Sequence, residues 1–306
     1  MKVIIKRTLQ ETLRISSILL VIVAAAVGGF VAGKAATYYN LPAFDYYLNE
    51  CLLVQHLAVF FLINGAVLMI LVSSVSSGLI AGEVHEGTIR LLVSKPNSRR
   101  TILLGKIIGV VIGEIVLMLM GLGIFMLVET LTGSFDGNII AELVGYFPAY
   151  VIYGFIVIVF FNSLATLFSC LFKKKVIALL PMLFLIICIL GVPVIIRVVM
   201  LISRKPALPA IVNYIDVNYH FGSILKWCCS LFGGIHGTSG QLEIPSILLN
   251  IFTSTSVDQD IIRAYGGPSL ITENNAIPML TLVIIYCVLT VVNYIGSFTI
   301  ISRKDV

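Results

Sequence analysis

The first residues with a spacing suited to chemistry match a phosphate-binding loop. Residues 28–34 read GGFVAGK and satisfy G-x-x-x-x-G-K, in which backbone amides and a lysine hold nucleotide phosphates. The next residue is Ala35, where such a loop needs a hydroxyl group for magnesium. The stretch also ends an apolar run, whereas a phosphate loop follows a buried strand. We therefore expect no bound cofactor in this chain.

Two patterns that would serve hydrolysis are also incomplete. His85 and Glu86 begin the zinc pattern H-E-x-x-H, but Ile89 stands where the second histidine is required. Ser239 lies in the pattern GTSG, yet all 4 histidines precede it, so no later segment presents a base to it. No cysteine pair has the spacing of a metal site. We expect no catalytic residue and no metal site.

The most densely charged stretch runs from Glu83 to Lys106 and separates two long apolar runs. Only 11% of the 306 residues are charged, 59% are hydrophobic, and the mean hydropathy is +1.07. Charge concentrated in this way faces water, a membrane surface or a partner. The residues from 80 to 93 are compatible with a helix that Pro96 stops. We expect Glu83, Glu86 and Arg90 to be exposed charges on it.

The elements that must position this stretch are membrane spans. A soluble domain carries about 25% charged residues and no apolar run near twenty residues. Six apolar windows are long enough to cross about 30 Å of hydrocarbon as helices. They run roughly over residues 15–33, 52–82, 102–131, 146–172, 176–202 and 277–301. The chain is therefore predicted to be one all-α integral membrane domain, residues 1–306.

The distribution of lysine and arginine predicts the orientation. Positive residues next to spans are retained on the cytoplasmic side, and here they cluster before the first span and after the second, fourth and sixth. We expect a multi-pass protein of the cell membrane with both termini in the cytoplasm. The net charge of +5 is then a signal of topology and not of nucleic-acid binding. Its environment is the lipid bilayer.

Residues 1–14 have the pattern of an amphipathic helix. Ile5, Leu9 and Leu13 recur at four-residue intervals, with Lys6 and Arg14 on a neighbouring face. This pattern is typical of an interfacial elbow helix on the cytoplasmic side. The alternative is a basic lead-in that only fixes orientation.

Small and charged residues mark two features of the third span. Gly105, Gly109 and Gly113 form a bare helix face that lets another helix approach closely, either within one subunit or across a dimer. Glu114 lies near the middle of the bilayer, where a charge costs roughly 2.5–3.5 kcal/mol. Glu114 therefore either faces protein or a translocation path, or is a protonated or snorkelling carboxyl group.

Three cysteines are expected on the outer side, where oxidation takes place. We hypothesise a disulfide from Cys51 to either Cys228 or Cys229.

The charged stretch resembles the signature of ABC-2 type permeases, the membrane subunits of ATP-binding cassette exporters. In that family a glutamate after the second span is followed by Gly-Thr, a leucine pair, a proline with Ser-Arg, and Gly-Lys as the third span begins. The matching residues here are Glu83, Gly87, Thr88, Leu91, Leu92, Pro96, Ser98, Arg99, Gly105 and Lys106. The match covers less than a tenth of the chain.

The resemblance implies a function for residues 83–101. They would form a cytoplasmic coupling segment, including a coupling helix, that rests on a separate ATPase subunit. Two copies of that ATPase would bind ATP and magnesium, and a second permease chain would complete a homodimer or heterodimer. The alternative is a channel or secondary transporter that needs no ATPase.

The segment from 203 to 276 is predicted to be an extracellular subdomain. Residues 208–232 are aromatic and apolar, and residues 245–265 begin with proline and end before two glycines, as a capped helix does. We expect short helices on the outer mouth. The high apolar content favours an amphipathic or peptide substrate.

Overall fold

The computed structural model describes residues 1–38, 44–87, 98–202, 213–235 and 277–303. Within these ranges all regular secondary structure is helical. Six helical segments are long and apolar enough to cross a membrane, as predicted. They are Ile15–Ala35, Tyr47–Ser77, Arg99–Thr132, Gly137–Leu171, Lys175–Ile196 and Met279–Arg303. The prediction of an all-α membrane protein with six spans is confirmed.

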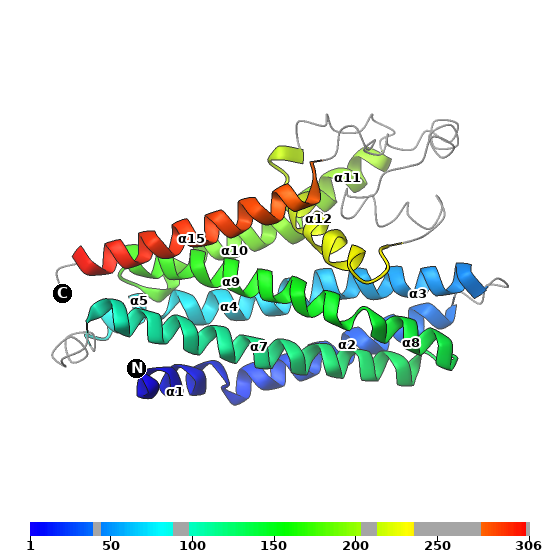
Figure 1. The fold of residues 1–306 in the computed structure, drawn as a ribbon, viewed down its shortest axis with the longest axis horizontal. Coiled ribbons are helices and arrows are strands. Elements are labelled where there is room, and N and C mark those ends of the chain that lie inside the picture. Colours follow the sequence, from blue (N-terminus) through cyan, green and yellow to red (C-terminus); the bar gives the residue numbers. More distant parts are fainter. Residues whose placement is uncertain (39–43, 88–97, 203–212, 236–276, 304–306) are drawn as a thin grey trace.

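The helices form an elongated bundle with both chain termini at the same end (Figure 1). The short helix α5 (Ala81–His85) and the start of α7 (Arg99–Thr132) also lie at that end. We call it the terminal end of the bundle. An even number of spans places the termini together, so the connections alternate between the two ends.

The first span packs along the third over nearly its whole length. Helix α1 (Lys2–Thr12) leads into α2 (Ile15–Tyr38), and the two run along α7. A side chain at Gly109 would meet Thr8 Cβ at 2.8 Å, and one at Gly113 would meet Thr12 Cγ2 at 2.7 Å. Gly105 lies likewise on Ile4. The bare face of α7 is therefore occupied by α1 of the same chain.

The second span contains a π-helix that the sequence analysis did not identify. Helix α3 (Phe44–Ala58) continues into η1 (Val59–Val67) and then α4 (Leu68–Ser77). A Cβ atom at Gly65 would collide with the carbonyl oxygen of Phe60. Glycine at this position therefore permits the wider helical turn, which shifts the angular position of later side chains.

The fourth span, α9 (Phe147–Leu171), lies among four other spans. It contacts α4, α7, α10 (Lys175–Leu190) and α15 (Met279–Arg303). Helix α10 stops at Gly191, and α11 (Val192–Ile202) follows. The fifth span is thus broken between Pro181, which lies inside α10, and Pro193, which lies in α11.

Two short helices remain, and the first of them lies at the end of the bundle opposite the termini (Figure 1). Helix α8 (Gly137–Gly145) lies between the predicted third and fourth spans. Helix α12 (Val217–Ser230) belongs to the predicted outer segment and contacts α9, α10 and α15. Most of its side chains are buried, so it extends the bundle core.

Candidate functional site

An ion pair joins α5 to α7 at the terminal end. The ammonium group of Lys106 contacts the Glu83 carboxylate, and these side chains are only 9% and 14% exposed. The same Lys106 Nζ donates to the carbonyl oxygen of Leu79 at 2.7 Å. A charged group so little hydrated needs both partners. Lys106 therefore fixes the start of α5 to the third span.

A second contact fixes α5 to the fourth span. The Ser169 hydroxyl of α9 accepts hydrogen bonds from Ile80 N at 2.9 Å and from Ala81 N at 3.0 Å. These amides belong to the first turn of α5, where no intrahelical acceptor is available. Ser169 thus supplies, from another helix, the cap that a local serine or aspartate usually provides.

The other end of α5 is exposed. His85, Glu86 and Gly87 face solvent, and Glu86 forms no ion pair among the described residues. Gly87 has φ +72°, a left-handed conformation that ends the helix and favours glycine. Helix α5 therefore ends before residue 93, earlier than we predicted.

The structure corrects one predicted exposure. Glu83 is paired and largely buried instead of being an exposed charge, because Lys106 meets it from α7. Arg99 opens α7, after Ser98 Oγ accepts from Thr101 N at 3.2 Å as its N-cap. Three of the predicted coupling residues, Thr88, Arg90 and Pro96, lie outside the described residues.

Glu114 is fully buried in α7. Neither of its carboxylate oxygens has a hydrogen-bond partner within the described residues. From the sequence, Glu114 either faces protein or a translocation path or snorkels, and its complete burial favours a position facing protein. A buried carboxyl group without a partner is unusual enough to point to a functional role.

A buried network of polar side chains lies near the opposite end of the bundle. Tyr150 OH donates to Gln55 Oε1 at 3.0 Å and lies 2.7 Å from His56 Nδ1. Gln55 Nε2 in turn donates to Glu129 Oε2 at 3.1 Å. We call these four residues the outer polar network, and they join the second, third and fourth spans. These residues were not predicted as a site, although polar residues inside apolar windows are a signal of one.

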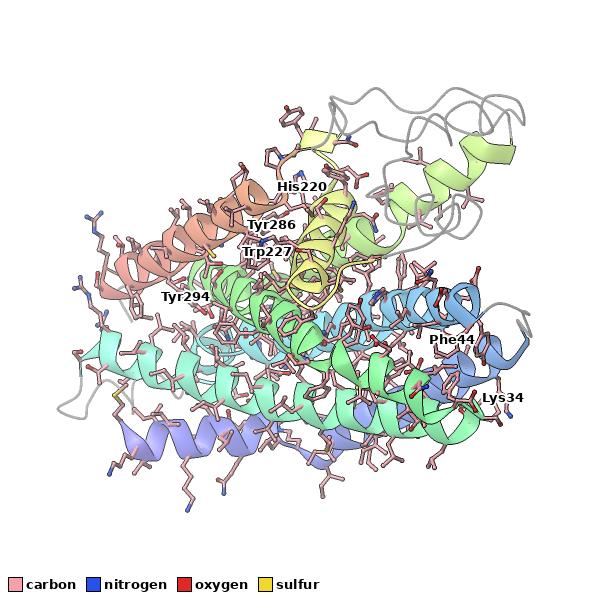
Figure 2. All side chains as sticks on the ribbon, turned by 45° about the vertical axis from the view of Figure 1, so that its right-hand side comes forward. Lys34, Phe44, His220, Trp227, Tyr286 and Tyr294 are labelled. Atoms are coloured by element: carbon pink, nitrogen blue, oxygen red, sulfur yellow. The ribbon has the colours of Figure 1, made fainter. Side chains whose placement is uncertain are left out.

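The outer polar network also reaches α12. Cys229 Sγ lies 4.0 Å from His56 Nδ1. On the same helix, His220 Nε2 is 2.8 Å from the carbonyl oxygen of Asn213, and its Nδ1 is 3.2 Å from Tyr286 OH. Figure 2 shows His220 on α12 beside Tyr286 of α15. Burial lowers the pKa of His220, an effect that the hydrogen bond to Asn213 partly opposes.

The structure does not contain the hypothesised disulfide: Cys51, Cys228 and Cys229 are free thiols in it. Cys51 precedes His56 by five residues on α3, which turns its side chain about 140° away from the side that faces Cys229. The Cys51 thiol instead forms a side-chain hydrogen bond with Tyr47. Burial raises the pKa of Cys228 to about 12, so this thiol is protonated at neutral pH.

Comparison with known proteins adds one match. The family model described as ABC-2 family transporter protein matches residues 70–306, from the last third of the second span onwards. The matched region includes the whole α5 site, Glu114 and the outer segment. No curated protein matches the chain.

Proposed function

The chain belongs to the ABC-2 family of transporter proteins, and on this premise we propose that it is the permease subunit of an exporter driven by a separate ATPase. Membership makes it a multi-pass membrane component of a transporter, in agreement with its six spans. Our proposal adds the coupling to ATP hydrolysis and the residues that carry it.

The observation that supports this proposal most strongly is the attachment of α5. One end of the helix is held by Lys106 of α7 and Ser169 of α9. The other end presents Glu86 to solvent. A short helix that is fixed to two spans and exposed at its tip can pass a displacement of the tip on to both spans. It would rest on the ATPase and act as the coupling element.

The contacts of α5 suggest how force would travel. When ATP binding draws two ATPase subunits together, a displacement of α5 would pull on α7 through Lys106 and on α9 through Ser169. Because α7 packs on α1 and α2 while α9 packs on α4 and α15, the two spans would carry different parts of the bundle. Relative tilting of these parts would open a path across the membrane.

The assembly follows from this role. Two copies of the ATPase, each with ATP and magnesium, would serve a pair of permease chains, either identical or different. The terminal end would face the cytoplasm of a cell, because α1, which carries Lys2 and Lys6, and the last turn of α15, which carries Arg303, lie at that end together with α5 (Figure 1).

The buried carboxyl group of Glu114 is our candidate for the translocation path. Its two oxygens have no partner in the described part of the chain, so they are available to a passing polar group. We propose an amphipathic or peptide substrate, a class that the high apolar content of the permease favours.

Glu86 provides the test of coupling. The permease is co-expressed with a candidate partner ATPase, and the Glu86→Arg variant is compared with Glu142→Arg. Glu142 is equally exposed but lies on α8 at the opposite end. We expect Glu86→Arg to reduce co-purification of the ATPase at least tenfold and to abolish stimulation of ATP hydrolysis. Wild-type behaviour of Glu86→Arg, or an equal loss in Glu142→Arg, would contradict the proposal.

A further inference from the structure

A polar cavity of about 490 Å³ lies at the terminal end of the bundle and reaches Glu86 at the tip of α5. It is open to solvent and is lined by residues of α1, the beginning of α2, the end of α4, α5, α7 and the beginning of α10. Four cationic side chains from different elements line it, namely Arg7, Arg14, Lys106 and Lys175. Three carboxylates also line it, namely Glu11, Glu83 and Glu86.

Two of these cations are already neutralised. Arg7 Nε lies 3.1 Å from Glu11 Oε1, and Lys106 is paired with Glu83. Arg14 and Lys175 form no ion pair with any described residue. Both side chains are exposed, and the stem of Lys175 lies on Gly78 at the wall of the cavity. Two cations therefore remain to face the single acidic group Glu86.

Helix ends and hydroxyl groups add further donors. Helix α2 begins at Ile15 and helix α10 begins at Lys175, and neither has an acidic residue in its first turn. The free amides and the positive end of the dipole of each helix favour an anion nearby. Ser16 and Ser17 of the first turn of α2 and Ser74 of α4 line the cavity as well. Together with Arg14 and Lys175, these groups suit the oxygens of a phosphate.

Beside the cavity, the membrane-spanning helices have apolar surfaces. Leu71 of α4 lines both the cavity and a narrow apolar crease that continues between α2 and α7. On the exposed faces of the bundle, Leu19 of α2 and Leu180 of α10 are 55% and 57% exposed. A ligand with its charge in the cavity would thus find apolar surface for attached chains.

We propose that this cavity binds the phosphate-bearing headgroup of an anionic lipid from the cytoplasmic leaflet. The position in that leaflet rests on the orientation given under the proposed function, whereas the binding of an anionic lipid does not depend on the ATPase. The headgroup phosphate accepts from Arg14, Lys175 and the serine hydroxyls, and the acyl chains lie along the apolar surfaces. The bound lipid would brace α1 and α10 on either side of α5.

The test uses the purified full-length chain in detergent, without the ATPase, titrated with a fluorescent phosphatidylglycerol. The Arg14→Gln/Lys175→Gln variant removes the two unpaired cations. The Lys6→Gln/Lys173→Gln variant is the matched control, since it removes the same charge from neighbouring exposed positions outside the cavity. Size-exclusion profiles establish that both variants remain folded.

We expect the cavity variant to lose about 25-fold in affinity, because each cation near an anionic headgroup contributes on the order of a fivefold factor. The control should change by less than about threefold, and the wild type should bind phosphatidylcholine with the same chains far more weakly. Equal loss in both variants, or no preference for phosphatidylglycerol, would overturn the proposal. Inorganic phosphate that binds as tightly as the lipid would also overturn it, because the cavity would then be a site for free phosphate.

Discussion

Lys106 on α7 and Glu83 on α5 form an ion pair that is almost excluded from solvent. This pair fixes α5 to α7, because the ammonium group of Lys106 also donates to the carbonyl oxygen of Leu79 at the start of α5. An exposed ion pair would contribute little, while a buried pair is costly to break from one side only.

Breaking the pair from one side should damage both stability and coupling. Lys106→Met removes the ammonium group that is paired with the largely buried Glu83 carboxylate, at a cost of about 3–5 kcal/mol. We expect a melting temperature several degrees lower and loss of ATPase stimulation in the reconstituted complex. Lys106→Met combined with Glu83→Gln should recover most of the melting temperature but not the stimulation. A double variant no more stable than Lys106→Met would show that the pair is not coupled.

A milder change at the attachment of α5 is available at Ser169 of α9. Ser169→Ala removes the acceptor of two buried amides of α5, and we expect it to cost about 1–3 kcal/mol. The stimulation of ATP hydrolysis should fall at least threefold, while membrane insertion and assembly with the ATPase are unchanged. Ser230→Ala is the control, because that hydroxyl donates only within its own helix, to Trp227 O. Full stimulation in Ser169→Ala would mean that α9 receives no force through this contact.

Glu114 should behave as a residue that serves function at the expense of stability. Glu114→Leu replaces two oxygens without partners by apolar groups, so the melting temperature should rise or stay the same. ATP-driven transport into inside-out vesicles, with ATP supplied on the outside, should nevertheless fall for Glu114→Leu, and less for Glu114→Gln, which keeps the polar shape. Unchanged transport in both variants would remove Glu114 from the path.

We expect the protein to lose stability in mild acid because of His220. Its pKa is lowered in the folded protein, so the folded state binds fewer protons than the unfolded state as pH falls below about 6.5. Stability therefore decreases as pH is lowered from 7.5 to 5.5. In His220→Gln this decrease in melting temperature should be smaller than in the wild type, and both proteins should be compared in the same detergent. An identical pH dependence in the two proteins would exclude His220 as a cause.

Composition and periodicity were sufficient to predict the six spans. Lipid leaves no alternative to helices for long apolar runs, so the number and approximate limits of the spans follow from local sequence. The π-helix at Gly65 was not predicted, because widening of a helical turn depends on neighbouring helices as well as on the glycine.

The sequence by itself determined that the chain is a helical membrane protein and that residues 83–106 include a charged site. The tertiary structure decided which charges act together, since Lys106, Ser169 and Glu83 meet only where three helices converge. It likewise left Cys51 turned away from Cys229, and it joined Gln55 to Glu129 and Tyr150. Local patterns reflect the contact of each residue with lipid or water, whereas pairing between polar groups depends on how the helices rotate and pack against one another.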